Sequence, residues 1–197
     1  MKQIIVATQN QGKVKEIKAV LGDLPVEVKT MGEIGIDIDI EENGTTFEEN
    51  AIIKAEALTK YTDALVIADD SGLEIDYLNK EPGVYSARYL GKDTPYTEKN
   101  QIILERLENV EKEKRTARFV CAIAMAMKGK ETQTAVEAME GYIGYEAQGT
   151  NGFGYDPIFF VPGLERSTAT LTMEEKNEIS HRAKALRVMK EKIKGML

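Results

Sequence analysis

Apolar residues occur along this chain in two patterns, and together the two patterns predict an α/β fold. Residues 4–7 and 64–67 are continuous apolar runs, which are typical of buried strands in the centre of a sheet. Other segments carry apolar residues three or four positions apart, as on one face of a helix. Val14, Ile17 and Leu21 follow this spacing soon after the first run. We therefore expect strands and helices to form one fold.

The same patterns locate the other elements. We predict strands over residues 3–8, 26–31, 64–67, 73–78, 116–127 and 132–145, the last two forming a hairpin. We predict helices over residues 14–21, 47–58, 95–107 and from 180 onward. The charge-rich residues 108–115 indicate an exposed loop.

Two helix starts have a recognisable spacing. Thr46 is followed three residues later by Glu49, and Thr172 is followed in the same way by Glu175. Both pairs fit a capping box, in which the two side chains bond reciprocally to the first turn of a helix. Isoleucines at every second position of residues 34–40 indicate an extended, half-buried segment instead.

The hexapeptide 68–73 (Ala-Asp-Asp-Ser-Gly-Leu) follows a predicted buried strand and contains two adjacent carboxylates. The carboxyl ends of strands in open α/β sheets are common ligand sites. Carboxylate oxygens suit a hard divalent cation, and a carboxylate can also take a proton from water. A solvated Asp-Asp-Ser-Gly turn is the competing interpretation, because such turns are common.

Residues 8–13 (Thr-Gln-Asn-Gln-Gly-Lys) lie between the first strand and the first helix. The free N–H groups and dipole of a helix amino terminus favour an anion, and Thr8, Asn10 and Lys13 add polar or cationic side chains. The P-loop spacing is absent. A strand-loop-helix connection without phosphate is equally compatible with this segment.

Further candidate residues lie in later segments. Asn50 and Lys54 are one helical turn apart, a pair that is usually solvated surface. The glycine-dense residues 149–157 contain Phe153, and aromatic rings among glycines can form a stacking surface for a base. Lys176, His181 and Arg182 together suggest recognition of acceptor atoms such as ring carbonyls or phosphate oxygens, although the single histidine is more commonly structural.

Composition narrows the function classes. The 197-residue chain has 42% hydrophobic residues and a formal net charge of -7, which disfavours a nucleic-acid polymer as partner. Its single cysteine, Cys121, excludes an internal disulfide framework and a Cys-rich zinc site. We find no signal peptide and no stretch approaching the ~20 apolar residues of a membrane span. We therefore expect a cytoplasmic protein.

Six segments in order resemble the inosine triphosphate pyrophosphatase family, whose members remove non-canonical purine nucleotides. The segments are residues 8–13, 42–51 with Lys54, 68–73, 82–88, 153–157, and 175–177 with 180–182. Each is weak alone, but six at these separations are highly specific. Asn43 and Asn151 occupy positions where the family more often has Thr and Gly.

The resemblance implies an elongated α/β fold with a long mixed sheet flanked by helices, two lobes and a central substrate cleft. Residues 1–197 would form a single domain without a separable linker, and the protein would be a homodimer. The implied reaction is Mg²⁺-dependent cleavage of ITP, dITP or XTP between the α and β phosphates, giving a monophosphate and pyrophosphate.

The resemblance also implies roles for individual residues. Asp70 would bind the metal and activate water, with Asp69 as its supporting carboxylate. Glu42 is favoured over Glu41 as the second metal ligand. The substrate would be bound by Thr8, Gln9, Asn10, Gln11, Gly12, Lys13, Lys54, Ser71, Phe153, Gly154, Tyr155, Asp156, Lys176, His181 and Arg182. Donors facing a 6-keto oxygen would be left unpaired by adenine, which explains discrimination against ATP.

Two alternative functions stay open from the residues. The first is another nucleotide hydrolase, such as a Maf-like pyrophosphatase acting on modified or pyrimidine triphosphates. The second is a non-catalytic module that binds nucleotides or RNA, although the acidic charge counts against RNA.

Overall fold

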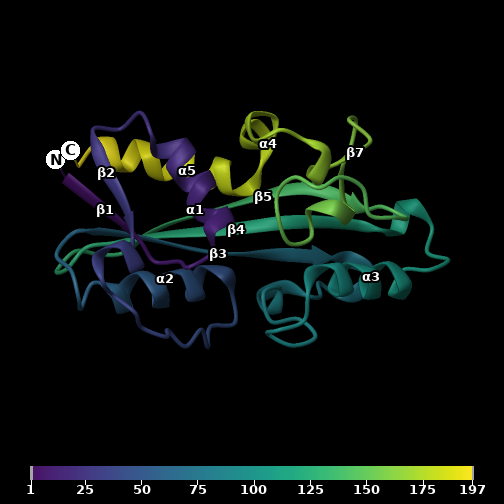
Figure 1. The fold of residues 1–197 in the computed structure, drawn as a ribbon, viewed down its shortest axis with the longest axis horizontal. Helices are drawn as coiled ribbons and strands as arrows, with labels where there is room; N and C mark the ends of the chain where they lie inside the picture. The colour runs from purple at the N-terminus through teal and green to yellow at the C-terminus, as the bar shows by residue number, and fades with distance from the viewer. Residues whose placement is uncertain (1, 197) are drawn as a thin grey trace. The chain divides into compact units, whose positions relative to one another are not determined.

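The computed structural model describes residues 2–196 and contains one seven-stranded sheet (Figure 1). The strands are β1 (Lys2–Val6), β2 (Val26–Thr30), β3 (Leu65–Ile75), β4 (Thr116–Ala126), β5 (Gln133–Ile143), β6 (Phe159–Val161) and β7 (Arg166–Ser167). Their order is β2-β1-β3-β4-β5-β6-β7. Strand β1 pairs in parallel with β2 and β3, whereas β6 pairs antiparallel with β5 and β7. The predicted α/β class and mixed sheet are therefore confirmed.

Five α-helices accompany these strands in residues 2–196. They are α1 (Gln11–Leu21), α2 (Phe47–Leu58), α3 (Tyr96–Arg106), α4 (Met173–Ile179) and α5 (His181–Lys194). Both predicted capping boxes are present: Glu49 N–H donates to Thr46 Oγ1 at 3.1 Å, and Glu175 N–H donates to Thr172 Oγ1 at 3.1 Å. Each box satisfies orphan donors of a first turn, which stabilises the helix by about 0.5–2 kcal/mol.

The chain divides into two compact units. Unit 1 consists of Met1–Asp70, Cys121–Glu137 and His181–Leu197, and unit 2 consists of Ser71–Val120 and Ala138–Ser180. The division falls between Asp70 and Ser71, inside strand β3. The prediction of a single domain, and the elongated shape and central cleft that the family resemblance implies, stay predictions.

In unit 1, helices α1 and α5 lie on one face of β1 and β3, and α2 lies on the opposite face (Figure 1). The core between the sheet and helices α1 and α5 includes Ile4, Val6, Ile17, Leu21, Ile67, Leu186 and Met189. Helix α2 buries the face that its sequence pattern predicts, namely Phe47, Ala51, Ala55 and Leu58. Each large side chain in such a core contributes about 1.5–3 kcal/mol through burial. The two faces of β3 in unit 1 are thus both covered.

Unit 2 has its own core, which includes Leu73, Ile75, Ile103, Leu107, Phe119, Ile143, Tyr155 and Phe159. The rings of Phe119 and Phe159 are 4.4 Å apart between centroids. Arg115 corrects one prediction, because it is 1% exposed although residues 108–115 were expected to form an exposed loop. Its guanidinium donates to the carbonyls of Ile143, Leu107 and Gly144, so its polar atoms are satisfied inside the unit.

Strand β3 corrects a second prediction. We expected two short strands, residues 64–67 and 73–78, with a turn as the competing interpretation of residues 68–73, but β3 runs unbroken from Leu65 to Ile75. Asp69 and Asp70 are therefore residues of a buried strand, and neither forms a solvated turn. The physical reason lies in the cations around them, which compensate charges that would otherwise disfavour burial.

Residues 34–40 belong to no strand, and only Ile34 is part of a regular element, the 3-10 helix Gly32–Ile34. The predicted alternation is nevertheless present. Ile34, Ile36, Ile38 and Ile40 are half-buried, whereas the residues between them are exposed. The segment is thus extended along the surface of unit 1 without pairing as a strand.

Candidate active site

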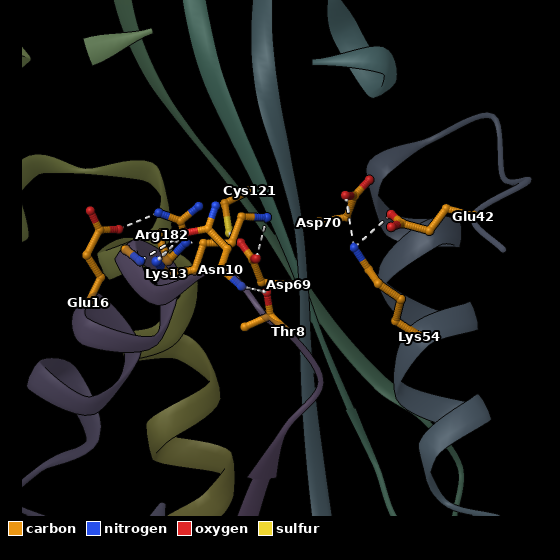
Figure 2. A network of polar contacts seen from close by, with 11 residues as sticks. Thr8, Asn10, Lys13, Glu16, Glu42, Lys54, Asp69, Asp70, Cys121 and Arg182 are labelled. Atoms are coloured by element: carbon orange, nitrogen blue, oxygen red, sulfur yellow. Dashed lines mark hydrogen bonds and ion pairs between the residues drawn. The ribbon is translucent and has the colours of Figure 1, made fainter. Parts of the chain in front are cut away.

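Asp69 and Asp70 are consecutive residues of β3, and their side chains point to opposite faces of the strand (Figure 2). They lie just beyond the point where β1 ends, because Val6, the last residue of β1, pairs with Ile67. The loop that follows β1 therefore comes to the level of the two aspartates, as expected for parallel strands. Each carboxylate contacts its own set of cations.

Asp69 is fully buried and faces helices α1 and α5. Its carboxylate lies 2.6 Å from Lys13 Nζ and 3.0 Å from Arg182 Nε. Burial alone would raise the pKa of Asp69, but the charges of Lys13 and Arg182 hold it well below its usual value. Asp69 is therefore a permanent anion that fixes two cations.

Arg182 extends this network into the interior. Its guanidinium bonds to Glu16 Oε2 as well as to Asp69, and both Arg182 and Glu16 are buried. The Cys121 thiol lies 3.4 Å from Asp69 Oδ2. The result is a chain of alternating charges from Glu16 through Arg182 and Asp69 to Lys13. Lys13, whose side chain is 15% exposed, is its outermost member.

The loop after β1 holds Lys13 in place. Asn10 is the N-cap of α1, and its Oδ1 accepts from the N–H groups of Gly12 at 2.9 Å and Lys13 at 3.2 Å. The Asn10 N–H donates in turn to Thr8 Oγ1 at 3.2 Å. Gln9 and Gln11 are exposed. The structure therefore builds the predicted strand-loop-helix turn, with the ammonium of Lys13 beside a helix amino terminus.

Asp70 lies on the other face of β3, toward helix α2 (Figure 2). Lys54 Nζ lies 3.1 Å from Asp70 Oδ1 and 2.8 Å from Glu42 Oε2, so one ammonium bridges two carboxylates. Burial raises the pKa of Asp70, and the charges of Lys54 and Lys13 oppose that rise. Burial also disfavours a charged Lys54, but Asp70 and Glu42 outweigh it and raise the pKa of the lysine.

The structure distinguishes Glu42 from Glu41. Glu42 contacts Lys54, whereas Glu41 is exposed. The segment that carries Glu42 is fixed by Asn50, which is fully buried on α2 and accepts from Gly44 N–H at 2.8 Å. Asn50 therefore departs from the solvated surface that is usual for such a pair. A Cβ on Gly44 would lie 2.7 Å from Asn50 Oδ1, so this approach requires glycine.

The pair Glu42 and Asp70 fits a hard divalent cation. Within residues 2–196, no three His, Cys, Asp or Glu side chains gather as a complete ligand set. However, Mg²⁺ at nucleotide sites is typically bound by one or two carboxylates, with water and substrate phosphates completing its shell. Asp70 Oδ2 is buried and receives no hydrogen bond from the described residues. Such an acceptor-only oxygen is a suitable ligand atom for a cation.

The predicted base-binding residues of unit 2 gather around Asp156. Its Oδ2 accepts from Lys176 Nζ at 2.7 Å and from Phe153 N–H at 2.9 Å, and its Oδ1 accepts from Thr168 Oγ1 at 2.9 Å. Lys176 Nζ lies 5.2 Å from the centroid of the Phe153 ring. A Cβ on Gly152 would lie 2.1 Å from Asp156 Oδ2. Asp156 therefore links the glycine-rich loop to helix α4.

The other predicted residues are placed as follows. Tyr155 is buried in the core of unit 2, and its hydroxyl donates to Ser86 O at 2.7 Å. Gly154 accepts through its carbonyl from Asn100 Nδ2 at 3.1 Å. Ser71 follows Asp70 in β3 and is half-buried. His181 is buried at the first residue of α5, next to Arg182.

Three residues with clear contacts were absent from the predicted set. Glu16 is paired with Arg182, Asn50 positions the Glu42 segment, and Thr168 binds Asp156. Glu16 and Thr168 lie in no motif that carries chemistry. The sequence contains no signal for either, because Glu16 lies near Lys15 and Lys18 and Thr168 lies between Ser167 and Ala169.

An open mixed sheet, with two buried carboxylates that each contact a lysine, defines an α/β protein whose site suits an anionic ligand bound together with a cation. A sequence profile of the Ham1 family matches residues 4–192. The chain therefore belongs to the Ham1 family, and the resemblance to inosine triphosphate pyrophosphatases is confirmed.

Individual relatives agree over nearly the whole chain. Proteins of Bacillus licheniformis and Bacillus subtilis, both named dITP/XTP pyrophosphatase, are each 53% identical over 187 residues. The alignments cover 95% of this chain and 95% and 94% of the two relatives. The solved structure of the Staphylococcus aureus Ham1 protein superposes with a TM-score of 0.88 at 43% identity, covering 100% of both chains.

A solved structure from Mycobacterium abscessus, described as a nucleoside-triphosphatase and dITP/XTP pyrophosphatase, has a TM-score of 0.75 at 38% identity. It covers 95% of this chain and 98% of its own.

Among residues 2–196, no helix has both the length and the apolar character needed to cross a membrane.

Proposed function

We propose that this protein is a nucleoside triphosphate pyrophosphohydrolase acting on dITP, XTP and ITP. It cleaves the bond between the α and β phosphates and releases a nucleoside monophosphate and pyrophosphate. Removing these nucleotides from the pool keeps deaminated purines out of DNA and RNA. The names of the 53% identical relatives support this assignment. The structural observation that carries it is the convergence of Glu42, Asp70 and Lys54 on one face of β3.

We assign Glu42 and Asp70 as the residues that hold Mg²⁺. The cation neutralises triphosphate charge and fixes the phosphate oxygens when it is bound. Asp70 also orients the attacking water and accepts its proton, which is the role of a general base. Glu41 is exposed and receives no role.

The phosphate chain binds to cations and amides of unit 1. Lys13 is held by Asp69, and Lys54 is held by the carboxylates of Glu42 and Asp70. The loop of residues 8–13 adds the amino terminus of α1. We also assign the Ser71 hydroxyl to a substrate contact. Positioned cations of this kind supply the charge stabilisation that phosphoryl chemistry needs.

The base is recognised by the residues around Asp156. Phe153 supplies a ring for stacking on the purine, and Lys176, which carries three donors, supplies a hydrogen bond to the 6-keto oxygen. The guanidinium of Arg182 is bonded to Asp69 and Glu16. We therefore assign the backbone N–H groups at His181 and Arg182, in the first turn of α5, as the further donors.

The wider setting also follows from the family. We propose a homodimer that works in the cytoplasm as one functional domain spanning residues 1–197. The match of the family profile to residues 4–192 supports the single functional domain. The net charge of -7 supports a small nucleotide as partner and disfavours a nucleic-acid polymer.

A substrate panel tests this function. Purified protein with Mg²⁺ is incubated with dITP, XTP, ITP, GTP, ATP and a pyrimidine triphosphate, and pyrophosphate and orthophosphate are measured separately. We expect pyrophosphate from the first three nucleotides at far higher rates than from the others, and no turnover after chelation with EDTA. Equal rates on all substrates would refute the specificity, release of orthophosphate alone would refute the bond assignment, and tight binding without turnover would indicate a binding module.

A further inference from the structure

Lys54 occupies the space between the two carboxylates assigned to the metal. Its ammonium lies 2.8 Å from Glu42 Oε2 and 3.1 Å from Asp70 Oδ1. Both distances are within hydrogen-bonding range, so the lysine is held by two charged acceptors at once. The ammonium compensates two anions that would otherwise repel each other at close range.

Lys54 is held firmly in this position. Its side chain is 11% exposed, as is that of Asp70, so water screens the contact poorly. Lys54 comes from the middle of α2, whose first turn is fixed by the capping box at Thr46. The segment that carries Glu42 is fixed on the same helix, because Asn50 binds Gly44 N–H at 2.8 Å. Both the lysine and the segment that carries Glu42 are thus held by contacts within unit 1.

A divalent cation that bridged the two oxygens contacted by the ammonium, Glu42 Oε2 and Asp70 Oδ1, would require the place that the ammonium fills. At the second oxygen of Asp70, Oδ2, a cation would still share one carboxylate with the ammonium and be repelled by its charge. We propose that Lys54 is an internal counterion that excludes free divalent cations from the nucleotide-free protein. Metal therefore enters bound to the triphosphate, whose oxygens give the displaced ammonium a new partner.

The second half of this proposal rests on the proposed function, because it requires a triphosphate as ligand. The first half does not, since it concerns only the protein and a free cation. Lys54 thereby has two successive partners: the carboxylates Glu42 and Asp70 before binding, and the phosphate oxygens afterward. The order of binding follows from charge balance. The ammonium compensates the two carboxylates before the metal arrives, and the triphosphate oxygens compensate the ammonium afterward, so no buried charge is left without a partner.

Binding of Mn²⁺ tests the proposal without turnover. Mn²⁺ prefers the same oxygen ligands as Mg²⁺, and free Mn²⁺ is counted directly by its electron paramagnetic resonance signal. We expect weak Mn²⁺ binding to the nucleotide-free wild-type protein at pH 8. Lys54→Met removes the internal counterion, so we expect Mn²⁺ to bind at least about tenfold more tightly, which corresponds to about 1.4 kcal/mol.

Lys13→Met is the matched control. It removes a cation from the same unit, but one that comes from helix α1 and is paired with Asp69 on the opposite face of β3. We expect its effect on Mn²⁺ affinity to be less than about threefold, that is, below 0.7 kcal/mol by the same conversion. Equal gains in Lys13→Met and Lys54→Met would show that overall charge, and not occupancy of the gap, controls affinity, and would overturn the proposal.

A second measurement uses the wild-type protein alone, in case Lys54→Met does not fold. Mn²⁺ affinity is compared with and without a non-hydrolysable triphosphate analogue in which a methylene group replaces the oxygen between the α and β phosphates. We expect at least about tenfold tighter binding of Mn²⁺ with the analogue. Equal affinity in both states would overturn the proposal. Failure of the proposed function would be seen separately. In that case the wild-type protein would release no pyrophosphate, although Lys54→Met would still bind Mn²⁺ more tightly.

Discussion

Asp156 Oδ2 and Lys176 Nζ lie 2.7 Å apart in unit 2, and both residues are almost completely buried. The contact holds the ammonium 5.2 Å from the centre of the Phe153 ring. Asp156 also fixes Phe153, because its Oδ2 accepts a hydrogen bond from the backbone N–H of Phe153. One carboxylate therefore sets the relation between the stacking ring and the donor that we assign to the purine.

Thr168 positions this carboxylate, and its removal should reduce base selectivity. Thr168→Val deletes the hydroxyl that donates to Asp156 Oδ1 at 2.9 Å. A hydrogen bond to a charged group is worth about 1.5–3 kcal/mol. We expect kcat/KM for XTP and dITP to fall about tenfold, mainly through KM, while the low rate on ATP changes little. Measurement of kcat and KM on the substrate panel decides.

Thr168→Ser is the matched control, because it keeps the hydroxyl and removes only a methyl group. We expect it to retain the selectivity of the wild-type protein. A structural role confined to packing predicts the reverse order, in which the valine variant, of similar volume, is less affected than the serine variant.

Asp70→Asn should abolish most turnover without disturbing the fold. The amide keeps the shape of the side chain but is neither a base nor an anionic metal ligand. Loss of a general base alone costs about 10²–10⁴ in rate. We expect at least this loss in kcat, with an unchanged circular dichroism spectrum. Asp76→Asn, at a carboxylate that bonds to Lys80 and Thr116, should keep near-normal activity. Near-normal turnover by Asp70→Asn would remove this residue from the mechanism.

Arg182→Met should strongly destabilise unit 1. The substitution removes the guanidinium that contacts both the buried carboxylate of Glu16 and that of Asp69. Breaking a buried ion pair by removing one partner costs about 3–5 kcal/mol. We expect a loss of this size in the free energy of unfolding, measured by urea denaturation.

The double variant Glu16→Gln with Arg182→Met checks the cause of that loss. Since it also removes the buried charge of Glu16, we expect it to be more stable than Arg182→Met alone. If the double variant loses the sum of the two single losses, the residues do not interact as the structure indicates.

Cys121 should be unreactive in the folded protein. Burial, and then the neighbouring carboxylate of Asp69, raise the pKa of the Cys121 thiol well above its ordinary value. The thiolate is the reactive form, so its fraction at pH 8 is far below that of a free cysteine. We expect slow reaction with a disulfide reagent in the native protein and rapid, single-site reaction in urea. Prompt labelling of the native protein at pH 8 would contradict the burial.

The same shift has a consequence for stability. A pKa that is raised on folding means that the folded state favours the neutral thiol. The resulting contribution to stability is complete below the ordinary pKa of a thiol, about 8.5. It is lost as the pH rises from there toward the raised value. Cys121→Ala should reduce this alkaline loss.

Helix faces and caps were predictable because they depend on neighbours in sequence. The apolar spacing of α1, α2 and α5 and the capping boxes at Thr46 and Thr172 are local patterns, and the structure confirms them. The hexapeptide 68–73 was not predicted to lie within a strand, because its local composition is unsuited to one. The cations that permit its burial are distant in sequence, with Arg182 separated from Asp69 by 113 positions.

The sequence contains a signal that distinguishes Glu42 from Glu41, namely the alternation of isoleucines at even-numbered positions just before them. Ile34, Ile36, Ile38 and Ile40 all turn inward as half-buried residues, and Glu42 continues the same parity. An extended segment alternates its side chains, so Glu42 turns inward and Glu41 outward. Glu16 had no such signal, because the carboxylate that pairs with Arg182 lies among lysines on a helix and resembles solvated surface.

The two aspartates of β3 belong to one peptide unit, yet each holds a different lysine. The Cα atoms of consecutive residues are about 3.8 Å apart, a spacing set by bond lengths and planarity. The spacing between the Cα atoms of the two residues that anchor Lys13 and Lys54 is therefore fixed covalently, and movements of α1 or α2 cannot stretch it. For a ligand whose own charges repeat along a chain of bonds, β3 fixes the spacing of the two residues that anchor the lysines.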